Sequence, residues 1–341
     1  MKTIEKIAMK KFFVLLLCTL CISCSGQRVE KMNGISFVGA PNEINETHVN
    51  PVVEIQANWA AVMPFGFLRS LKTPNVIFNI ERQWWGERRD GAKRTIELLN
   101  ERGIKVMLKP QIWVWRGEFT GNILMDSEEN WTALEKSYED FILLYAKLAE
   151  ELNVPLFCIG TELHTFVQKR SDFWRQLIKK VKSIYQGDLT YAENWDQFQN
   201  VPFWEELDYI GIDAYFPVSE SKTPTVEEIK IGWKQHKIKI MELQSVMDKK
   251  VLFTEYGYRS IHYTGKEPWD ANRVNGNINL QAQNNALTAI YEEFWEESWF
   301  AGGFLWKWYH NHTEVGGENN NRFTIQNKPA EDLIKSLYKD E

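Results

Sequence analysis

Short apolar runs alternate with longer amphipathic segments along most of the chain. Eight of the apolar runs have the length and composition of buried strands: 34–39, 59–65, 104–110, 155–160, 188–194, 208–215, 250–256 and 301–308. Their nearly continuous apolar character is typical of strands that are covered on both faces. A ninth run, at 75–80, is expected in a long loop after the second strand.

The amphipathic segments between these runs predict helices at 88–102, 127–152, 171–185, 223–247, 279–298 and 328–339. The segment 127–152 has the clearest pattern, because its apolar residues recur every three or four positions and so share one helical face. Ser127 is suited to cap its start, and Pro155 follows shortly after its end.

Strands that alternate with helices indicate an α/β protein with a parallel sheet. Eight such units fit a (β/α)8 TIM barrel, which takes about 250 residues or more. We therefore predict a single barrel domain over residues 33–341, preceded by a short linker at 24–32. An open, doubly wound sheet is the alternative, but the first expected strand is followed by GAPNEINE and not by a glycine-rich phosphate loop.

The composition narrows the class of protein. The chain has 341 residues, of which 44% are hydrophobic, enough for a large core. Its net charge of −6 argues against a nucleic-acid partner, which favours a basic surface. The 15 tryptophans allow aromatic platforms for flat ligands as well as core packing. We expect a monomer.

The N-terminus has the pattern of a targeting segment. Lys10 and Lys11 precede an apolar stretch at 12–22, which is too short for a permanent membrane span and fits a signal peptide. The following Ser23-Cys24 resembles a bacterial lipoprotein cleavage site. We expect residues 1–23 to be removed, Cys24 to become the lipidated first residue, and the protein to be exported to the periplasm or cell envelope. If Cys24 is lipidated, the lipid would be the only contact with a membrane. The alternative is ordinary secretion, with cleavage nearby.

Carboxylates and aromatic residues collect where the expected strands end, which is where barrel enzymes place their chemistry. The fourth strand ends in GTELH, with Glu162 and His164, and the seventh in TEYGY, with Glu255. The other strand ends supply Trp113, Trp115, Arg116, Glu193, Asn194, Trp195, Asp196, Asp213, Tyr215 and the segment LWKWYHNH.

Two carboxylates on non-adjacent strands predict glycoside hydrolysis, in which one must be protonated and the other ionised. Aromatic rings suit the faces of pyranose sugars, and Arg, Asn and His suit their hydroxyls. Glu193 and Asp213 are rivals to the pair, because each also ends a strand. We expect those two to support the pair or to contact substrate, and we leave open whether His164 is structural.

Other chemistries have weaker signals. The sequence has no His-x-x-x-His pair, no cysteine cluster and no Gly-x-Ser-x-Gly elbow, so neither a metal nor a cofactor is expected. His310 and His312 form a weak metal candidate. Trp84 and Trp85, in ERQWWGERR, either wall a sugar subsite or cover the barrel rim.

Several strand motifs together carry a family resemblance. They are NGISF, ANWAAVMPF, KPQIWVWRG, FCIGTEL, TYAENW, DYIGIDAYFP, VLFTEYGY and GGFLWKW. With these motifs in this order, the chain resembles the (β/α)8 glycosidases that place an acid/base on the fourth strand and a nucleophile on the seventh. Within that clan it is most similar to glycoside hydrolase family 113, the β-mannanases.

This resemblance implies roles for particular residues. Glu162 would be the general acid/base and Glu255 the nucleophile, held by Tyr215. The sugar subsites would be lined by Trp115, Arg116, Asn194 and Trp306. Thr161 departs from the wider clan, in which many members carry an asparagine that touches the sugar 2-hydroxyl.

The resemblance therefore implies a retaining hydrolase that cleaves β-1,4-mannosidic bonds in mannan, glucomannan or manno-oligosaccharides. An exo-acting enzyme, or one specific for another β-hexoside, keeps the same chemistry. A glycan-binding lipoprotein that has lost catalysis is the alternative from another class.

Overall fold

The computed structural model describes residues 30–271 and 277–339. The expected signal segment, Cys24 and most of the expected linker lie outside the described residues, and the compact unit begins at Lys31. Within the described ranges, no helix is long and apolar enough to cross a membrane.

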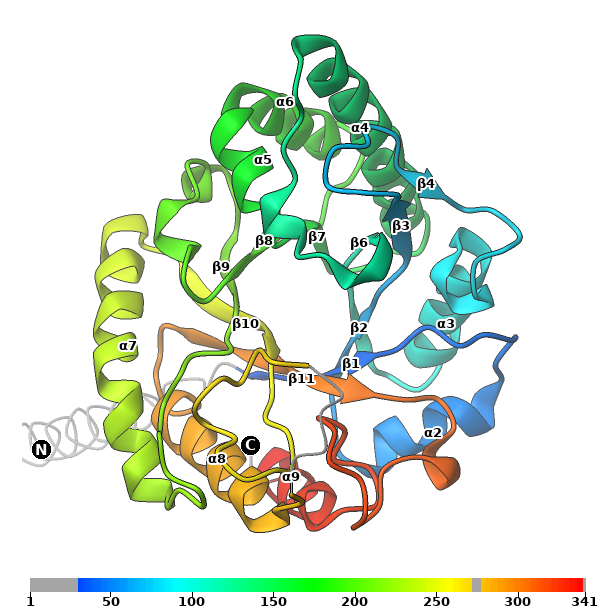
Figure 1. The fold of residues 1–341 in the computed structure, drawn as a ribbon. Helices are drawn as coiled ribbons and strands as arrows, with labels where there is room; N and C mark the ends of the chain where they lie inside the picture. The colour runs from blue at the N-terminus through cyan, green and yellow to red at the C-terminus, as the bar shows by residue number, and fades with distance from the viewer. Residues whose placement is uncertain (1–29, 272–276, 340–341) are drawn as a thin grey trace, which may run out of the picture. The chain divides into compact units, whose positions relative to one another are not determined.

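The predicted (β/α)8 barrel is confirmed. Eight parallel strands close in the order β1-β11-β10-β9-β8-β7-β5-β2 around a central axis, with helices on the outside (Figure 1). The strands are β1 (Met32–Phe37), β2 (Trp59–Val62), β5 (Lys105–Leu108), β7 (Leu156–Thr161), β8 (Asp188–Asn194), β9 (Tyr209–Asp213), β10 (Lys250–Tyr256) and β11 (Phe300–Trp308).

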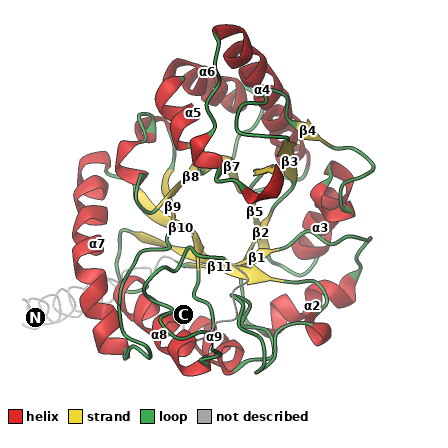
Figure 2. Ribbon diagram, in the orientation of Figure 1, coloured by secondary structure: helices red, strands yellow, loops and turns green. Residues whose placement is uncertain are grey.

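Helices form the outer layer of the barrel (Figure 2). The α-helices are α2 (Glu46–Glu54), α3 (Arg89–Asn100), α4 (Glu128–Glu151), α5 (His164–Lys169), α6 (Ser171–Lys182), α7 (Val226–Met247), α8 (Leu280–Phe294) and α9 (Pro329–Lys339). Short 3-10 helices are η1 (Trp85–Glu87), η2 (Trp115–Gly117), η3 (Thr120–Asn122), η4 (Phe198–Asn200), η5 (Trp204–Glu206) and η6 (His312–Glu314). As expected, the Ser127 side chain caps α4 by accepting from the Asn130 N–H. Helix α2 was not predicted, because Pro51 within it normally argues against a helix interior.

Two prolines lie at the ends of two of the predicted strands, 59–65 and 104–110. Pro64 separates β2 from β3 (Phe65–Leu68), and Pro110 separates β5 from β6 (Gln111–Val114). Because proline has no N–H to donate, each strand leaves the barrel ladder there. Beyond the prolines, β3 pairs with β6. Strand β4 (Ile77–Phe78), which lies within the ninth apolar run, completes this small second sheet.

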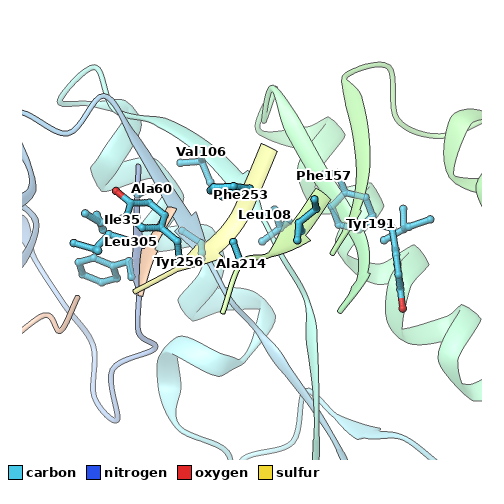
Figure 3. Close-up of a cluster of buried hydrophobic side chains, with 14 of the residues drawn as sticks. Ile35, Ala60, Val106, Leu108, Phe157, Tyr191, Ala214, Phe253, Tyr256 and Leu305 are labelled. Carbon is cyan, nitrogen blue, oxygen red and sulfur yellow. The ribbon is translucent and has the colours of Figure 1, made fainter. Parts of the chain in front are cut away.

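The barrel core has an inner and an outer set of side chains, because successive residues of a strand point to opposite faces. On β7, Leu156 and Cys158 belong to a cluster built from strand residues alone, whereas Phe157 and Ile159 pack with helical residues. Figure 3 shows part of the outer cluster. The inner cluster fills the barrel, so chemistry is confined to its mouth.

Candidate active site

A pocket of about 550 Å³ opens where the barrel strands end. It brings together five of the residues to which the family resemblance gives a role: Glu162, Asn194, Tyr215, Glu255 and Trp306. These residues lie at or directly after the C-terminal ends of β7, β8, β9 and β10, and near the end of β11. Two carboxyl groups and several rings thus face one cavity.

The Glu255 carboxylate is held by three donors. The Tyr215 hydroxyl donates to Oε2 at 2.8 Å, and the Gln111 side-chain amide donates to Oε1 at 2.9 Å. The Lys109 ammonium donates to Oε1 at 2.6 Å. Glu255 is only 6% exposed, and these charge-assisted contacts compensate its burial and fix its orientation.

A second buried carboxyl group shares the Lys109 ammonium. Lys109 Nζ lies 3.1 Å from Asp213 Oδ1, which also accepts from the Thr254 hydroxyl at 2.7 Å. Burial lowers the pKa of Lys109, but the carboxylates of Asp213 and Glu255 outweigh it and raise the pKa above its usual value. Burial raises the pKa of Asp213 to about 7, and Glu255 adds to the rise. Asp213 has no exposed surface and does not line the pocket.

Lys109 and Gln111 were missed in the sequence. Both flank Pro110, at the point where the chain leaves the barrel ladder for the small sheet. A lysine after the apolar run VML is unusual for a buried strand, and this was the available signal.

The Glu162 carboxyl group has a different environment. Glu162 directly follows β7 with a left-handed φ of 51°, and its N–H donates to the Ala192 carbonyl at 2.8 Å. The residue is partly exposed in the pocket. Desolvation raises its pKa well above the usual range, and the negative charges of Asp213 and Glu255 raise it further. Glu162 is therefore suited to hold a proton at neutral pH, next to a carboxylate that accepts three hydrogen bonds.

Glu193, the other rival, supports the segment that carries Glu162. Its Oε1 accepts from the Asn194 N–H at 2.9 Å, and its Oε2 accepts from the Tyr191 hydroxyl at 3.3 Å. The same hydroxyl accepts from the N–H of Leu163, the residue after Glu162, at 2.8 Å. Glu193 is fully buried, and burial raises its pKa to about 8. His164 Nδ1 lies 3.9 Å from its Oε2.

Replacing Glu193 by glutamine is expected to make stability less dependent on pH. Between pH 4.5 and about 8, the folded protein keeps the Glu193 proton that the unfolded chain releases. The free energy of unfolding therefore falls as pH rises through this window. Glutamine does not titrate, so the Tm of Glu193→Gln minus the Tm of the parent should increase from pH 5 to pH 9. The corresponding change in the free energy of unfolding is a few kcal/mol at most.

Thermal unfolding followed by circular dichroism at three pH values measures this difference. The exposed Glu205, in the 3-10 helix η5, provides the matched control Glu205→Gln. A difference in Tm between Glu193→Gln and the parent that stays constant with pH would contradict the assignment.

Aromatic residues from loops complete the pocket. Trp195 and Trp269 stack with ring centroids 5.0 Å apart and an interplanar angle of 23°. Phe119 and Phe323 also line the cavity, the latter from the loop after β11. Phe119 and Trp269 were not predicted, because nothing in a loop sequence shows which way an aromatic side chain points.

Two predicted subsite residues lie elsewhere. Arg116 lines a neighbouring cavity of about 790 Å³, which shares Phe119, Trp269 and Ala271 with the catalytic pocket. Trp115 is 68% exposed and lines a third cavity of about 480 Å³ together with Trp84. The structure therefore separates Trp115 from the two glutamates. Among residues 30–271 and 277–339, no three His, Cys, Asp or Glu side chains are grouped to hold a metal ion.

The sequence profile of Glycoside Hydrolase Family 113 matches residues 41–328, most of the chain. The chain belongs to this family. No curated protein sequence matches it.

Solved structures agree with membership of family 113. The chain is similar to the family 113 β-mannanase of Alicyclobacillus acidocaldarius in complex with ManMIm, with 25% identity, 92% of this chain and 98% of that chain covered, and a TM-score of 0.80. A second family 113 β-1,4-mannanase, also a complex, shares the fold at 24% identity, with coverage of 92% and 100% and a TM-score of 0.79. A Faecalibacterium prausnitzii β-glucuronidase shares only the barrel fold, at 13% identity and a TM-score of 0.61, over 91% of this chain and 49% of that chain.

Proposed function

We propose that this family 113 glycoside hydrolase cleaves β-1,4-mannosidic bonds within mannan, glucomannan or manno-oligosaccharides, with retention of configuration. The observation that supports this proposal most strongly is the contrast between Glu162 and Glu255 in one pocket. One carboxyl group has a raised pKa, and the other accepts hydrogen bonds from Lys109, Gln111 and Tyr215. The mannan specificity is inferred from the resemblance to β-mannanases at 25% identity.

The proposed reaction is a double displacement. A Glu255 oxygen attacks the anomeric carbon while Glu162 donates its proton to the departing glycosidic oxygen. The glycosidic bond breaks and a glycosyl ester of Glu255 forms. Glu162, now a carboxylate, takes a proton from a water molecule, which attacks the anomeric carbon and releases Glu255. Each step inverts the anomeric centre once, so the product keeps the β configuration.

A glycan panel tests the substrate. The protein should release short manno-oligosaccharides from linear β-mannan and glucomannan, and nothing from cellulose or xylan. Hydrolysis that is confined to short oligosaccharides, and that removes sugars from one end only, would favour an exo-acting enzyme. Binding of mannan without hydrolysis, unchanged in Glu162→Ala and Glu255→Ala, would instead indicate a glycan-binding protein.

Lys109→Met is expected to lower kcat/KM by about 100-fold, because a cation that orients and neutralises the nucleophile is lost. The change also leaves Asp213 and Glu255 buried without their shared countercharge, so stability should fall by a few kcal/mol. The acid limb of the pH–rate profile should move to higher pH, because removing a nearby positive charge raises the pKa of a carboxyl group.

The double variant Lys109→Met/Asp213→Asn is the control, since it removes Lys109 together with one of the two carboxyl groups that contact it. It should recover part of the stability but not the parent's acid limb. A folded Lys109→Met protein with the parent's pH profile would show that Lys109 is only structural.

A further inference from the structure

A third cavity, here called the rim pocket, lies between the small sheet and the loop before α3. Its volume is about 480 Å³, and its lining residues include Arg69, Ile80, Arg82, Trp84, Glu87 and Trp115. It shares no lining residue with the catalytic pocket. Nothing in the two-glutamate mechanism uses it.

The rim pocket has an excess of positive charge. Arg69 and Arg82 are both exposed, and neither guanidinium forms an ion pair or hydrogen bond with another side chain or backbone group among residues 30–271 and 277–339. The only lining carboxyl group is that of Glu87, which accepts from the Trp84 N–H at 3.2 Å. The lining of the rim pocket therefore carries two free guanidinium groups and one carboxyl group, which is already hydrogen-bonded.

Two tryptophans give the rim pocket flat apolar walls. The side chain of Trp84 is 52% exposed and that of Trp115 is 68% exposed. Large aromatic rings left this open are uncommon on a soluble surface and mark binding sites when they gather around a concavity. Ring faces of this kind suit the apolar face of a pyranose.

One strand, β6, connects the rim pocket to the catalytic site. Strand β6 begins at Gln111, which donates to Glu255, and Trp115 follows directly after its end. Four residues of extended chain span roughly 13 Å. Trp113, between them, lines the cavity that adjoins the catalytic pocket.

We propose that the rim pocket binds a hexuronic acid residue of an acidic glycan. The sugar ring packs on Trp84 and Trp115, and its carboxylate lies between Arg69 and Arg82. A planar guanidinium matches a carboxylate with two parallel hydrogen bonds, a geometry that lysine does not offer. The inference goes beyond the proposed mannanase activity, and it does not require that Glu162 and Glu255 cleave the bound chain.

Binding is measured by isothermal titration calorimetry on the Glu162→Gln protein, in which hydrolysis is suppressed. The ligands are a tetrasaccharide of alternating mannose and glucuronic acid, neutral mannotetraose, and a sulfated mannotetraose. The uronate tetrasaccharide should bind about tenfold or more tightly than mannotetraose, as expected for charge-assisted hydrogen bonds. This preference should weaken as salt is raised.

Variants on the same background place the effect in the rim pocket. Arg69→Gln/Arg82→Gln should lose the preference for uronate and leave binding of mannotetraose unchanged, and Trp115→Ala should weaken binding of the uronate ligand. Lys179→Gln/Lys182→Gln removes two exposed charges from α6, outside the pocket, and should keep the preference.

Equal affinity of the Glu162→Gln protein for charged and neutral tetrasaccharides would overturn the proposal, as would a preference that survives when the two arginines are also replaced. Tighter binding of the sulfated ligand than of the uronate would overturn the assignment to a carboxylate. All of these outcomes are independent of hydrolysis, so they are distinguishable from failure of the mannanase proposal.

Discussion

Glu255→Ala is expected to reduce hydrolysis of β-mannan by about 10⁵-fold or more, because no other group can form the covalent intermediate. Azide should restore turnover of an activated aryl β-mannoside, since the small anion fits the space that the carboxylate vacates. The product should be the α-mannosyl azide, formed by a single inversion. Kinetics with and without azide, together with mass spectrometry and proton NMR of the product, measure this.

The matched control is Asp196→Asn, which changes another carboxyl group lining the same pocket. It should retain most activity and gain nothing from azide. A folded Glu255→Ala protein that hydrolyses mannan at more than a hundredth of the parent's rate would exclude Glu255 as the nucleophile.

Glu162→Gln is expected to lower kcat on mannan by about 10²–10⁴-fold, the range for loss of a general acid. An aryl mannoside with a good leaving group needs little protonation, so its first displacement should be far less affected. Burial and the charges of Asp213 and Glu255 raise the pKa of Glu162, so the parent should stay active at neutral pH and lose activity as pH rises through that pKa. Glutamine does not titrate, and the variant should lack this basic limb.

Rates on mannan and on the aryl substrate, measured from pH 4 to pH 10, test this prediction. Glu193→Gln is the matched control, because Glu193 is a buried carboxyl group that does not line the pocket. It should keep a basic limb. Equal losses of kcat/KM, which reports the first displacement, on both substrates for Glu162→Gln, with the basic limb intact, would rule out general acid catalysis by Glu162.

Much of the fold could be predicted because the strand signal is local. The expected strand at 250–256 coincides with β10, where two lysines precede a continuous apolar run. The same reasoning joined β2 to β3 across Pro64, because apolar composition alone does not show where a strand leaves one sheet for another. It also missed α2, whose Pro51 is tolerated in a helix that the Asn45 side chain caps.

Some residues of the active site could likewise be predicted from the sequence, and others could not. Glu162 and Glu255 could be predicted, because barrel enzymes place their chemistry at the C-terminal strand ends and because the motifs GTEL and FTEYGY resemble those of the (β/α)8 glycosidases. A strand-end position alone did not separate them from Glu193 and Asp213, which are fully buried and do not line the pocket. Lys109 could not, because its role depends on Asp213 and Glu255, which lie 104 and 146 residues further along the chain. The loop residue Trp269 depends in the same way on its stacking partner Trp195.

The most direct test of the two-glutamate account is the configuration of the first product. Mannohexaose is hydrolysed in an NMR tube, and the anomeric proton signals of the new reducing ends are followed from the first minutes, before mutarotation. The account predicts that the β-anomer appears first and that the α-anomer grows in later. Initial release of the α-anomer would show a single displacement by water, and would contradict the assignment of Glu255 as a nucleophile.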